Sequence, residues 1–144
     1  MAVKKYFACV EAKIKVEFYD VDSMDIVYHG NYVQFLERAR CFFLEKLNYT
    51  YVDMKNEGYA FPIVELSIKY IRSLKFREEA VVKVYLTEYE NCLKFDYEIF
   101  NQEGVLVTKA STTQMVIDSR TNKTLFVCPQ SLIKKVESFI GNEE

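Results

Sequence analysis

The chain has 144 residues, half of them apolar, which suits one domain with a proper hydrophobic core. Its formal net charge is −2, and its 19 basic and 21 acidic residues form no basic stripe, which argues against a nucleic-acid partner. No segment approaches the roughly 20 apolar residues of a membrane span. We therefore expect one domain over residues 1–144, located in the cytoplasm without stable membrane insertion.

The four cysteines are widely separated in the sequence, at Cys9, Cys41, Cys92 and Cys128. No pair has the close spacing of a zinc site or of a redox motif. The simplest expectation is buried, reduced thiols in a cytosolic protein, with no metal and no other cofactor.

The first half of the chain predicts a strand followed by a helix. Residues around 9–19 alternate loosely between apolar and polar, which favours a strand. From Asn31 to about Leu47, apolar residues recur at spacings of three and four, which predicts a helix with one apolar face. We expect Asn31 to cap this helix, with Gln34 completing a weak capping box. Arg40 falls on the predicted polar side.

In the second half, apolar residues recur at every second position, which is typical of strands. The alternating segments lie around residues 62–72, 80–90, 92–100 and 105–118. Short polar turns such as Asn101–Gly104 join them, so we expect an antiparallel meander. A final helix is predicted from about Gln130 to Phe139. Because the apolar face of the long helix must pack on the sheet, the fold class is α+β.

The connection between the first strand and the long helix carries the most chemistry. It contains Asp20, Asp22, Asp25 and His29, the only histidine of the chain. Carboxylate and imidazole act as nucleophile, general base or general acid near neutral pH. Residues 28–32 would lie at the positive end of the helix, where free N–H groups can stabilise an oxyanion. These features favour an acyl-transfer site; the alternative is that the aspartates only shape the loop.

Three sequence runs carry a resemblance to a known family. Asp20–Asp22, Ile26–Tyr32 and Phe35–Arg40 together resemble the signature of the 4-hydroxybenzoyl-CoA thioesterase family. The likeness is strongest to the family's bacterial short-chain acyl-CoA branch, which is associated with the Tol-Pal cell-envelope system. It continues through Phe61–Tyr70 and Val105–Asp118, so it covers most of the chain.

The resemblance implies a hotdog fold, in which an antiparallel sheet wraps one long central helix. It also implies a homodimer with a continuous sheet, often doubled to a homotetramer, with active sites at the dimer interface. The implied reaction is hydrolysis of a small or medium acyl-CoA to free acid and coenzyme A. Asp22 would be the nucleophile or general base. His29 would orient the substrate, handle a proton and support the oxyanion, while Asp20 would be structural.

Further residues are candidates for binding the substrate. Tyr28 and Tyr32 would line an acyl tunnel, although simple core packing explains them equally well. Arg72 and Lys75 belong to a short basic cluster that would meet coenzyme A phosphates or form an ordinary charged loop. The run Ser23–Asp25 departs from the small residues usual in the family, which bears on substrate preference.

Two rival functions share the implied fold. One is a hydratase or dehydratase acting on acyl-thioesters, although such enzymes place their histidine in a different motif. The other is a non-catalytic module that binds acyl-CoA or an acyl-carrier protein, since a fold does not fix a function. The sequence leaves open the acyl group, coenzyme A against acyl-carrier protein, and dimer against tetramer.

Overall fold

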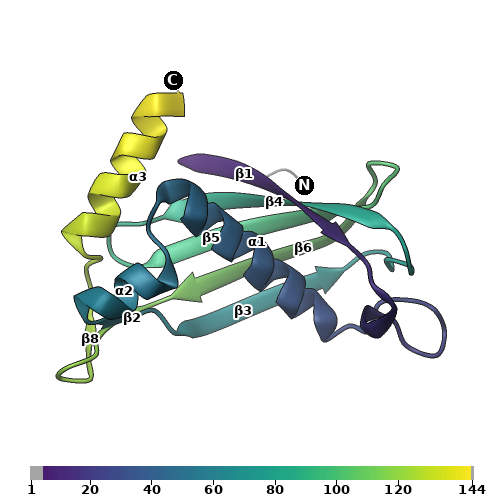
Figure 1. Ribbon diagram of the computed structural model, residues 1–144, viewed down its shortest axis with the longest axis horizontal. Helices are drawn as coiled ribbons and strands as arrows, with labels where there is room; N and C mark the ends of the chain where they lie inside the picture. Colours follow the sequence, from purple (N-terminus) through teal and green to yellow (C-terminus); the bar gives the residue numbers. More distant parts are fainter. Residues whose placement is uncertain (1–4, 144) are drawn as a thin grey trace.

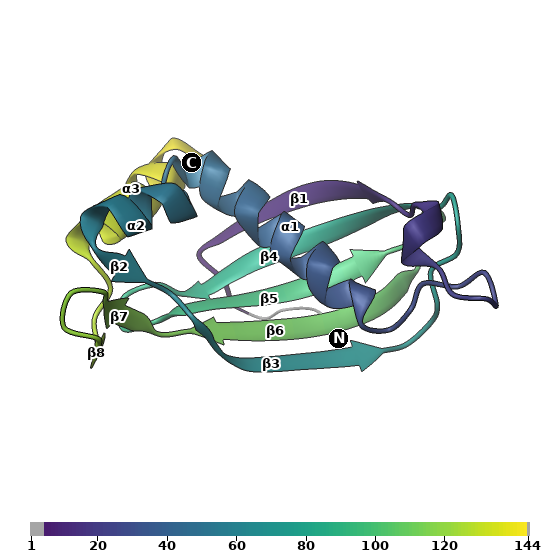
Figure 2. The same ribbon diagram turned by 60° about the horizontal axis from the view of Figure 1, so that its bottom comes forward.

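The computed structural model describes residues 5–143, and its main element is a five-stranded antiparallel sheet (Figure 1). The spatial order of the strands is β1-β4-β5-β6-β3. Their bounds are β1 (Ala8–Lys15), β3 (Ile63–Tyr70), β4 (Glu79–Glu88), β5 (Leu93–Phe100) and β6 (Leu106–Gln114). The long helix α1 (Asn31–Leu47) lies across one face of this sheet, as Figure 2 shows. Helix and sheet together have the α+β layout that the sequence predicts.

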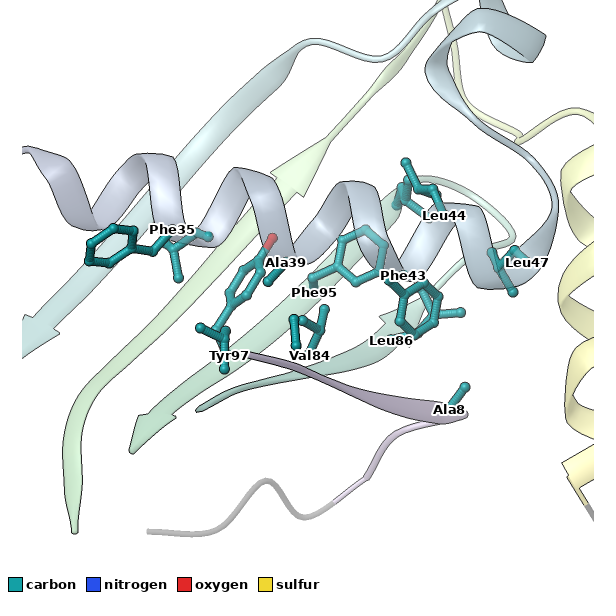
Figure 3. Close-up of a cluster of buried hydrophobic side chains, with 14 of the residues drawn as sticks. Ala8, Phe35, Ala39, Phe43, Leu44, Leu47, Val84, Leu86, Phe95 and Tyr97 are labelled. Carbon is teal, nitrogen blue, oxygen red and sulfur yellow. The ribbon is translucent and has the colours of Figure 1, made fainter. Parts of the chain in front are cut away.

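The core lies between α1 and the sheet (Figure 3). The predicted apolar face of α1 is buried, and its buried apolar residues are Tyr32, Phe35, Leu36, Ala39, Phe43, Leu44 and Leu47. The rings of Phe43 and Phe95 meet edge to face, with centroids 5.2 Å apart. Burying side chains of this size contributes about 1.5–3 kcal/mol each, so this layer fixes the position of α1 on the sheet.

Smaller elements cover the far end of α1. Helix α2 (Tyr51–Glu57) is capped by Thr50, whose side chain accepts a hydrogen bond from the Asp53 N–H. A second sheet contains β2 (Tyr59–Ala60), β7 (Val116–Asp118) and β8 (Lys123–Leu125). The predicted final helix is confirmed as α3 (Gln130–Glu143). Within residues 5–143, no helix is both long and apolar enough to cross a membrane.

The predicted meander holds only for β4, β5 and β6. Strand β3 pairs with β6 instead of β4, with Ile68 opposite Ala110. The connection after β3 is too long for a hairpin, and it packs on the loop before α1, where the Val27 N–H donates to the Leu74 carbonyl. The chain then continues into β4, on the other side of β5 and β6, so β3 lies at an edge of the sheet.

Two predicted boundaries and one predicted exposure were wrong. The first strand ends at Lys15, because Glu17 and Asp20 cap a short 3₁₀ helix, η1 (Phe18–Asp20), through reciprocal hydrogen bonds. The strand predicted at 105–118 breaks at Met115, after which β7 joins the smaller sheet. Arg40 is buried and does not lie on a solvated face of α1.

Candidate active site

The loop between η1 and α1 is a tight hairpin that presents Asp22. An antiparallel bridge joins Val21 to Val27, and the Asp22 N–H donates to the Ile26 carbonyl at 2.9 Å. One carboxylate oxygen of Asp22, Oδ1, accepts the Met24 N–H at 2.8 Å, an Asx-type turn. Asp25 closes the turn with a φ of 68°, a left-handed conformation that aspartate tolerates better than most residues. Backbone and carboxylate together therefore hold Asp22 in place.

Asp20 is part of the framework of this loop. It is buried, and its side chain accepts the Glu17 N–H at 2.8 Å. Its carbonyl accepts hydrogen bonds from the Tyr28 N–H at 3.0 Å and from the Asn31 side-chain amide at 2.9 Å. These contacts are consistent with the structural role predicted for Asp20.

The predicted capping of α1 was wrong by one residue. Gly30 is the N-cap, and Asn31 is the first helical residue, whose amide reaches back to Asp20 instead of capping the helix. The predicted capping box with Gln34 does not form. The chain enters the helix with near-helical backbone angles at Gly30, so the cap is a backbone turn without a side-chain acceptor.

The start of α1 supplies unused donors. The Asn31 N–H donates to the Tyr28 carbonyl at 2.9 Å, and the Tyr32 N–H reaches the His29 carbonyl at 3.4 Å. Within residues 5–143, the backbone N–H groups of His29 and Gly30 donate to no other atom. Two N–H groups at the positive end of a 17-residue helix suit a developing negative charge.

A pocket of about 240 Å³ lies beside this helix start. Its lining comprises Asp22, Ile26, Val27, His29, Tyr32, Tyr70, Ile71, Arg72 and Ser73. Four of the predicted site residues, Asp22, His29, Tyr32 and Arg72, therefore share one cavity. Tyr28 and Lys75 do not line it. The arrangement places a carboxylate, an imidazole and a guanidinium around one small volume.

Tyr28 lies on the open side of the site. Its ring is half exposed and packs against the His29 ring, with centroids 4.4 Å apart. It also lies over Gly30, where an added Cβ would come within 2.8 Å of the Tyr28 ring. Gly30 thus allows Tyr28 to fold back onto His29.

Lys75 lies in a neighbouring pocket of about 510 Å³, which Arg72 and Ser73 also line. Arg72 therefore lines both pockets, whereas Lys75 lines only the larger one. An isolated bridge between Ile26 and Lys75 joins this connection to the Asp22 loop.

Tyr70 was missed by the sequence interpretation. Its hydroxyl donates to the His29 carbonyl at 2.8 Å, and its ring meets that of Tyr32 edge to face at 5.1 Å. Tyr32 is buried, and its hydroxyl accepts the Leu74 N–H at 3.0 Å; this burial raises the pKa of Tyr32. Two tyrosines from different elements therefore brace the helix start. The only sequence signal was a tyrosine at the end of a strand.

Met24 and Asp25, the departures from the family pattern, are exposed residues at the tip of the turn and do not line the pocket. Among residues 5–143, no group of three or more His, Cys, Asp or Glu side chains could hold a metal ion.

Sequence comparisons relate the chain to known thioesterases. The model of the thioesterase-like superfamily matches residues 16–136. YneP of Bacillus subtilis, provisionally named an acyl-CoA thioesterase, is 32% identical over 78% of this chain and 83% of its own. The acyl-CoA thioester hydrolase YbgC of Escherichia coli is 25% identical over 85% of this chain and 89% of its own.

Solved structures give the same result. A crystal structure of DHNA-CoA thioesterase from Staphylococcus aureus has a TM-score of 0.81 and 29% identity, covering 94% of this chain and 95% of that one. The hotdog fold predicted from the sequence is confirmed. The chain belongs to the thioesterase-like superfamily. It is a thioester hydrolase, which favours the enzyme over the non-catalytic alternative.

Proposed function

We propose that the chain hydrolyses acyl-CoA to a free acid and coenzyme A. The observation that carries this proposal is the pocket at the start of α1, which Asp22 and His29 both line in a member of the thioesterase-like superfamily. A carboxylate, an imidazole and free N–H donors are the components that acyl transfer uses. The names of the B. subtilis and E. coli relatives support acyl-CoA as the substrate class.

In the proposed reaction, Asp22 attacks the thioester carbonyl carbon or removes a proton from the water that attacks it. The carbonyl oxygen becomes an oxyanion, which the N–H groups of His29 and Gly30 stabilise together with the positive end of α1. The C–S bond breaks, the thiolate takes up a proton, and water supplies the new oxygen of the acid. The His29 imidazole orients the substrate and handles the proton.

We assign the predicted binding residues to two parts of the substrate. Tyr32 forms the inner wall of the acyl site, and Tyr28 covers it from the open side next to His29. Arg72 and Lys75 contact coenzyme A phosphates, because both line the larger pocket and Arg72 also lines the small one. The small pocket volume, about 240 Å³, supports a small or medium acyl group.

The motif runs Asp20–Asp22 and Ile26–Tyr32 support a finer placement in the 4-hydroxybenzoyl-CoA thioesterase family and its short-chain branch. We further propose one catalytic domain without a metal or prosthetic cofactor. The four cysteines are free thiols, which supports a reducing compartment, the cytoplasm.

Strand β3 supports a homodimer. It is an edge strand whose apolar residues are unusually open, with Ile63, Val64 and Leu66 exposed by 41%, 57% and 43%. Backbone groups on such an edge form a template for pairing with a second copy. We propose that two chains pair through β3 into one continuous sheet, and that two dimers can assemble into a tetramer. Tyr70, on the same strand, would bring the interface next to the site.

Thiol release from a panel of acyl-CoAs and acyl-carrier-protein thioesters tests the catalytic proposal. Asp22→Asn keeps an oxygen for the Met24 N–H, so the turn is retained while the carboxylate is lost. We expect turnover to fall by about 10³-fold or more, as for other removed nucleophiles. Asp25→Asn is the matched control, because Asp25 lies on the same turn outside the pocket.

Equal turnover in Asp22→Asn and wild type would reject Asp22 as the catalytic carboxylate. Substrate binding without release by the wild type would instead favour the non-catalytic module, and hydration of an unsaturated acyl group would favour the hydratase. If thiol release were faster from the carrier-protein thioester, acyl-carrier protein rather than coenzyme A would be the thiol carrier of the preferred substrate.

A further inference from the structure

Arg40 is a buried cation in the interior of the domain. Only 6% of its surface is exposed. Its Nε donates to the Tyr51 hydroxyl at 2.7 Å and its Nη1 to the Tyr97 hydroxyl at 3.2 Å. The Tyr97 hydroxyl lies 2.7 Å from Thr112 Oγ1. In Figure 3 the Tyr97 hydroxyl points from β5 toward α1. These four residues, named here the Arg40 cluster, come from four different elements.

The charge of Arg40 has no counter-charge in the described chain. Within residues 5–143, the only ion pair is the surface contact between Arg120 and Asp118. The partners of Arg40 are neutral hydroxyls, and these two hydrogen bonds use two of the five N–H donors of a guanidinium. A buried cation without an anion is unfavourable, and an anionic group bound beside it would remove that cost.

Polar atoms near Arg40 also have hydrogen-bonding capacity that the described residues do not use. The Tyr51 hydroxyl accepts from Arg40 and from Gln114 Nε2, so its own hydrogen is available to donate. Gln114 and Thr108 are almost fully buried, and within the described residues Gln114 Oε1 and Thr108 Oγ1 have no hydrogen-bond partner. Buried polar atoms are normally paired, so this part of the interior is equipped to bind a further polar group.

A row of residues links the Arg40 cluster to the candidate active site. Residues on β6 alternate between faces, so Thr108, Ala110 and Thr112 share the face that α1 covers. Thr108 pairs with Tyr70, which lines the active-site pocket. The row therefore begins beside the pocket and ends at Thr112, in the Arg40 cluster.

The helix presents a parallel row. Tyr32, Leu36 and Arg40 are spaced by four residues and lie one above the other along α1. Tyr32 lines the pocket, and the rise of about 1.5 Å per residue places Arg40 about 14 Å along the axis from Asn31. An extended acyl chain advances about 1.25 Å per bond, because its bonds of about 1.5 Å zigzag, so about twelve carbons cover a similar distance.

Within one chain, the edge strand β3 is exposed on the side that faces α1. Leu66 pairs with Thr112 and Tyr70 with Thr108, so both face the α1 side of the sheet, yet they are exposed by 43% and 46%. Helix α1 therefore does not cover β3. An acyl chain entering at His29 could lie along this uncovered strip toward Arg40.

We propose that the Arg40 cluster is a subsite for a carboxylate at the far end of the acyl group. The preferred substrate is then an acyl-CoA of about twelve carbons whose chain ends in a carboxylate. This inference rests on the proposed function, since it takes the thioester to lie at Asp22 and His29. Arg40 binds the carboxylate through its free N–H groups, and Tyr51 donates its hydroxyl hydrogen.

The test compares kcat/KM for three acyl-CoAs of matched length that end in a methyl, a hydroxyl or a carboxylate group. Wild type should prefer the carboxylate over the methyl end by roughly tenfold or more. Arg40→Met should lose that preference, Arg40→Lys should keep part of it, and Arg38→Met, an exposed arginine on the same helix, should leave it unchanged.

Thr112→Val and Tyr51→Phe remove single hydroxyls and serve if Arg40→Met does not fold; each should reduce the carboxylate preference by several-fold. A wild type that prefers the methyl or hydroxyl end, or folded variants that keep the wild-type preference, would overturn the subsite. Turnover of the methyl-ended substrate that still depends on Asp22 would then leave the proposed hydrolase intact. No turnover of any substrate would reject both.

Discussion

Tyr32→Phe is the sharpest test of how the candidate site is braced. The substitution removes the hydroxyl that accepts the Leu74 N–H at 3.0 Å, while the ring keeps its edge-to-face contact with Tyr70. Leu74 is fully buried, so its N–H would lose its only protein partner without gaining water. Leaving a buried donor unpaired costs about 1–3 kcal/mol, and no cavity forms because only one oxygen is lost.

This cost should appear as a lower melting temperature. For a chain of about this size, each kcal/mol corresponds to about 2–4 °C in Tm, so we expect a decrease of about 2–12 °C. Thermal unfolding followed by circular dichroism measures the change. Hydrogen exchange at the Leu74 amide locates it, because that amide should lose its protection before the sheet does.

Tyr19→Phe is the matched control, since Tyr19 is 76% exposed and its hydroxyl faces solvent. We expect its Tm to stay within about 1 °C of wild type, as for most surface substitutions. If Tyr32→Phe melted like Tyr19→Phe and Leu74 stayed protected, the inferred coupling between α1 and the connection after β3 would be refuted.

Three further predictions concern Gly30, Tyr70 and Tyr85. Gly30→Ala should push the Tyr28 ring away from the helix start, since the new Cβ would lie 2.8 Å from it; we expect a fall in kcat/KM with Tm lowered by less than about 2 °C. Tyr70→Phe removes the hydrogen bond to the His29 carbonyl, and kcat should fall about two- to tenfold at unchanged Tm. Burial and a glutamate partner raise the pKa of Tyr85, so this residue stabilises the fold below about pH 10 and loses that effect as pH rises further; urea midpoints of Tyr85→Phe should fall less steeply with alkaline pH.

The elements that local sequence patterns define were predicted well. Helix α1 begins at Asn31 and ends at Leu47, as its apolar spacing indicates, because that spacing makes a continuous stripe for the sheet. Strands β4 and β5 likewise follow their period of two. Short elements such as β2 were missed, because two residues carry no period and form a strand only through pairing with β7.

Contacts between distant residues explain the predictions that failed. Arg40 follows Ala39 on the helix, and its type alone places it on the solvated side. Its burial depends on hydroxyls from Tyr51 and Tyr97, which α2 and β5 bring to the helix. A helical projection contains neither partner, so only the folded chain reveals that the position is internal.

The candidate site likewise combines residues that are close together in the sequence with residues that only the fold brings near. Asp22 and His29 lie on one short run of the sequence, so the prediction of a site at this place rests on local residues alone. Tyr70 reaches the His29 carbonyl from β3, across 41 residues of sequence. The groups assigned to chemistry are therefore local, whereas the groups that position them are long-range. Because Tyr70 also lies on the exposed edge strand, any contact that moves β3 would act directly on the start of α1, where the proposed oxyanion donors lie.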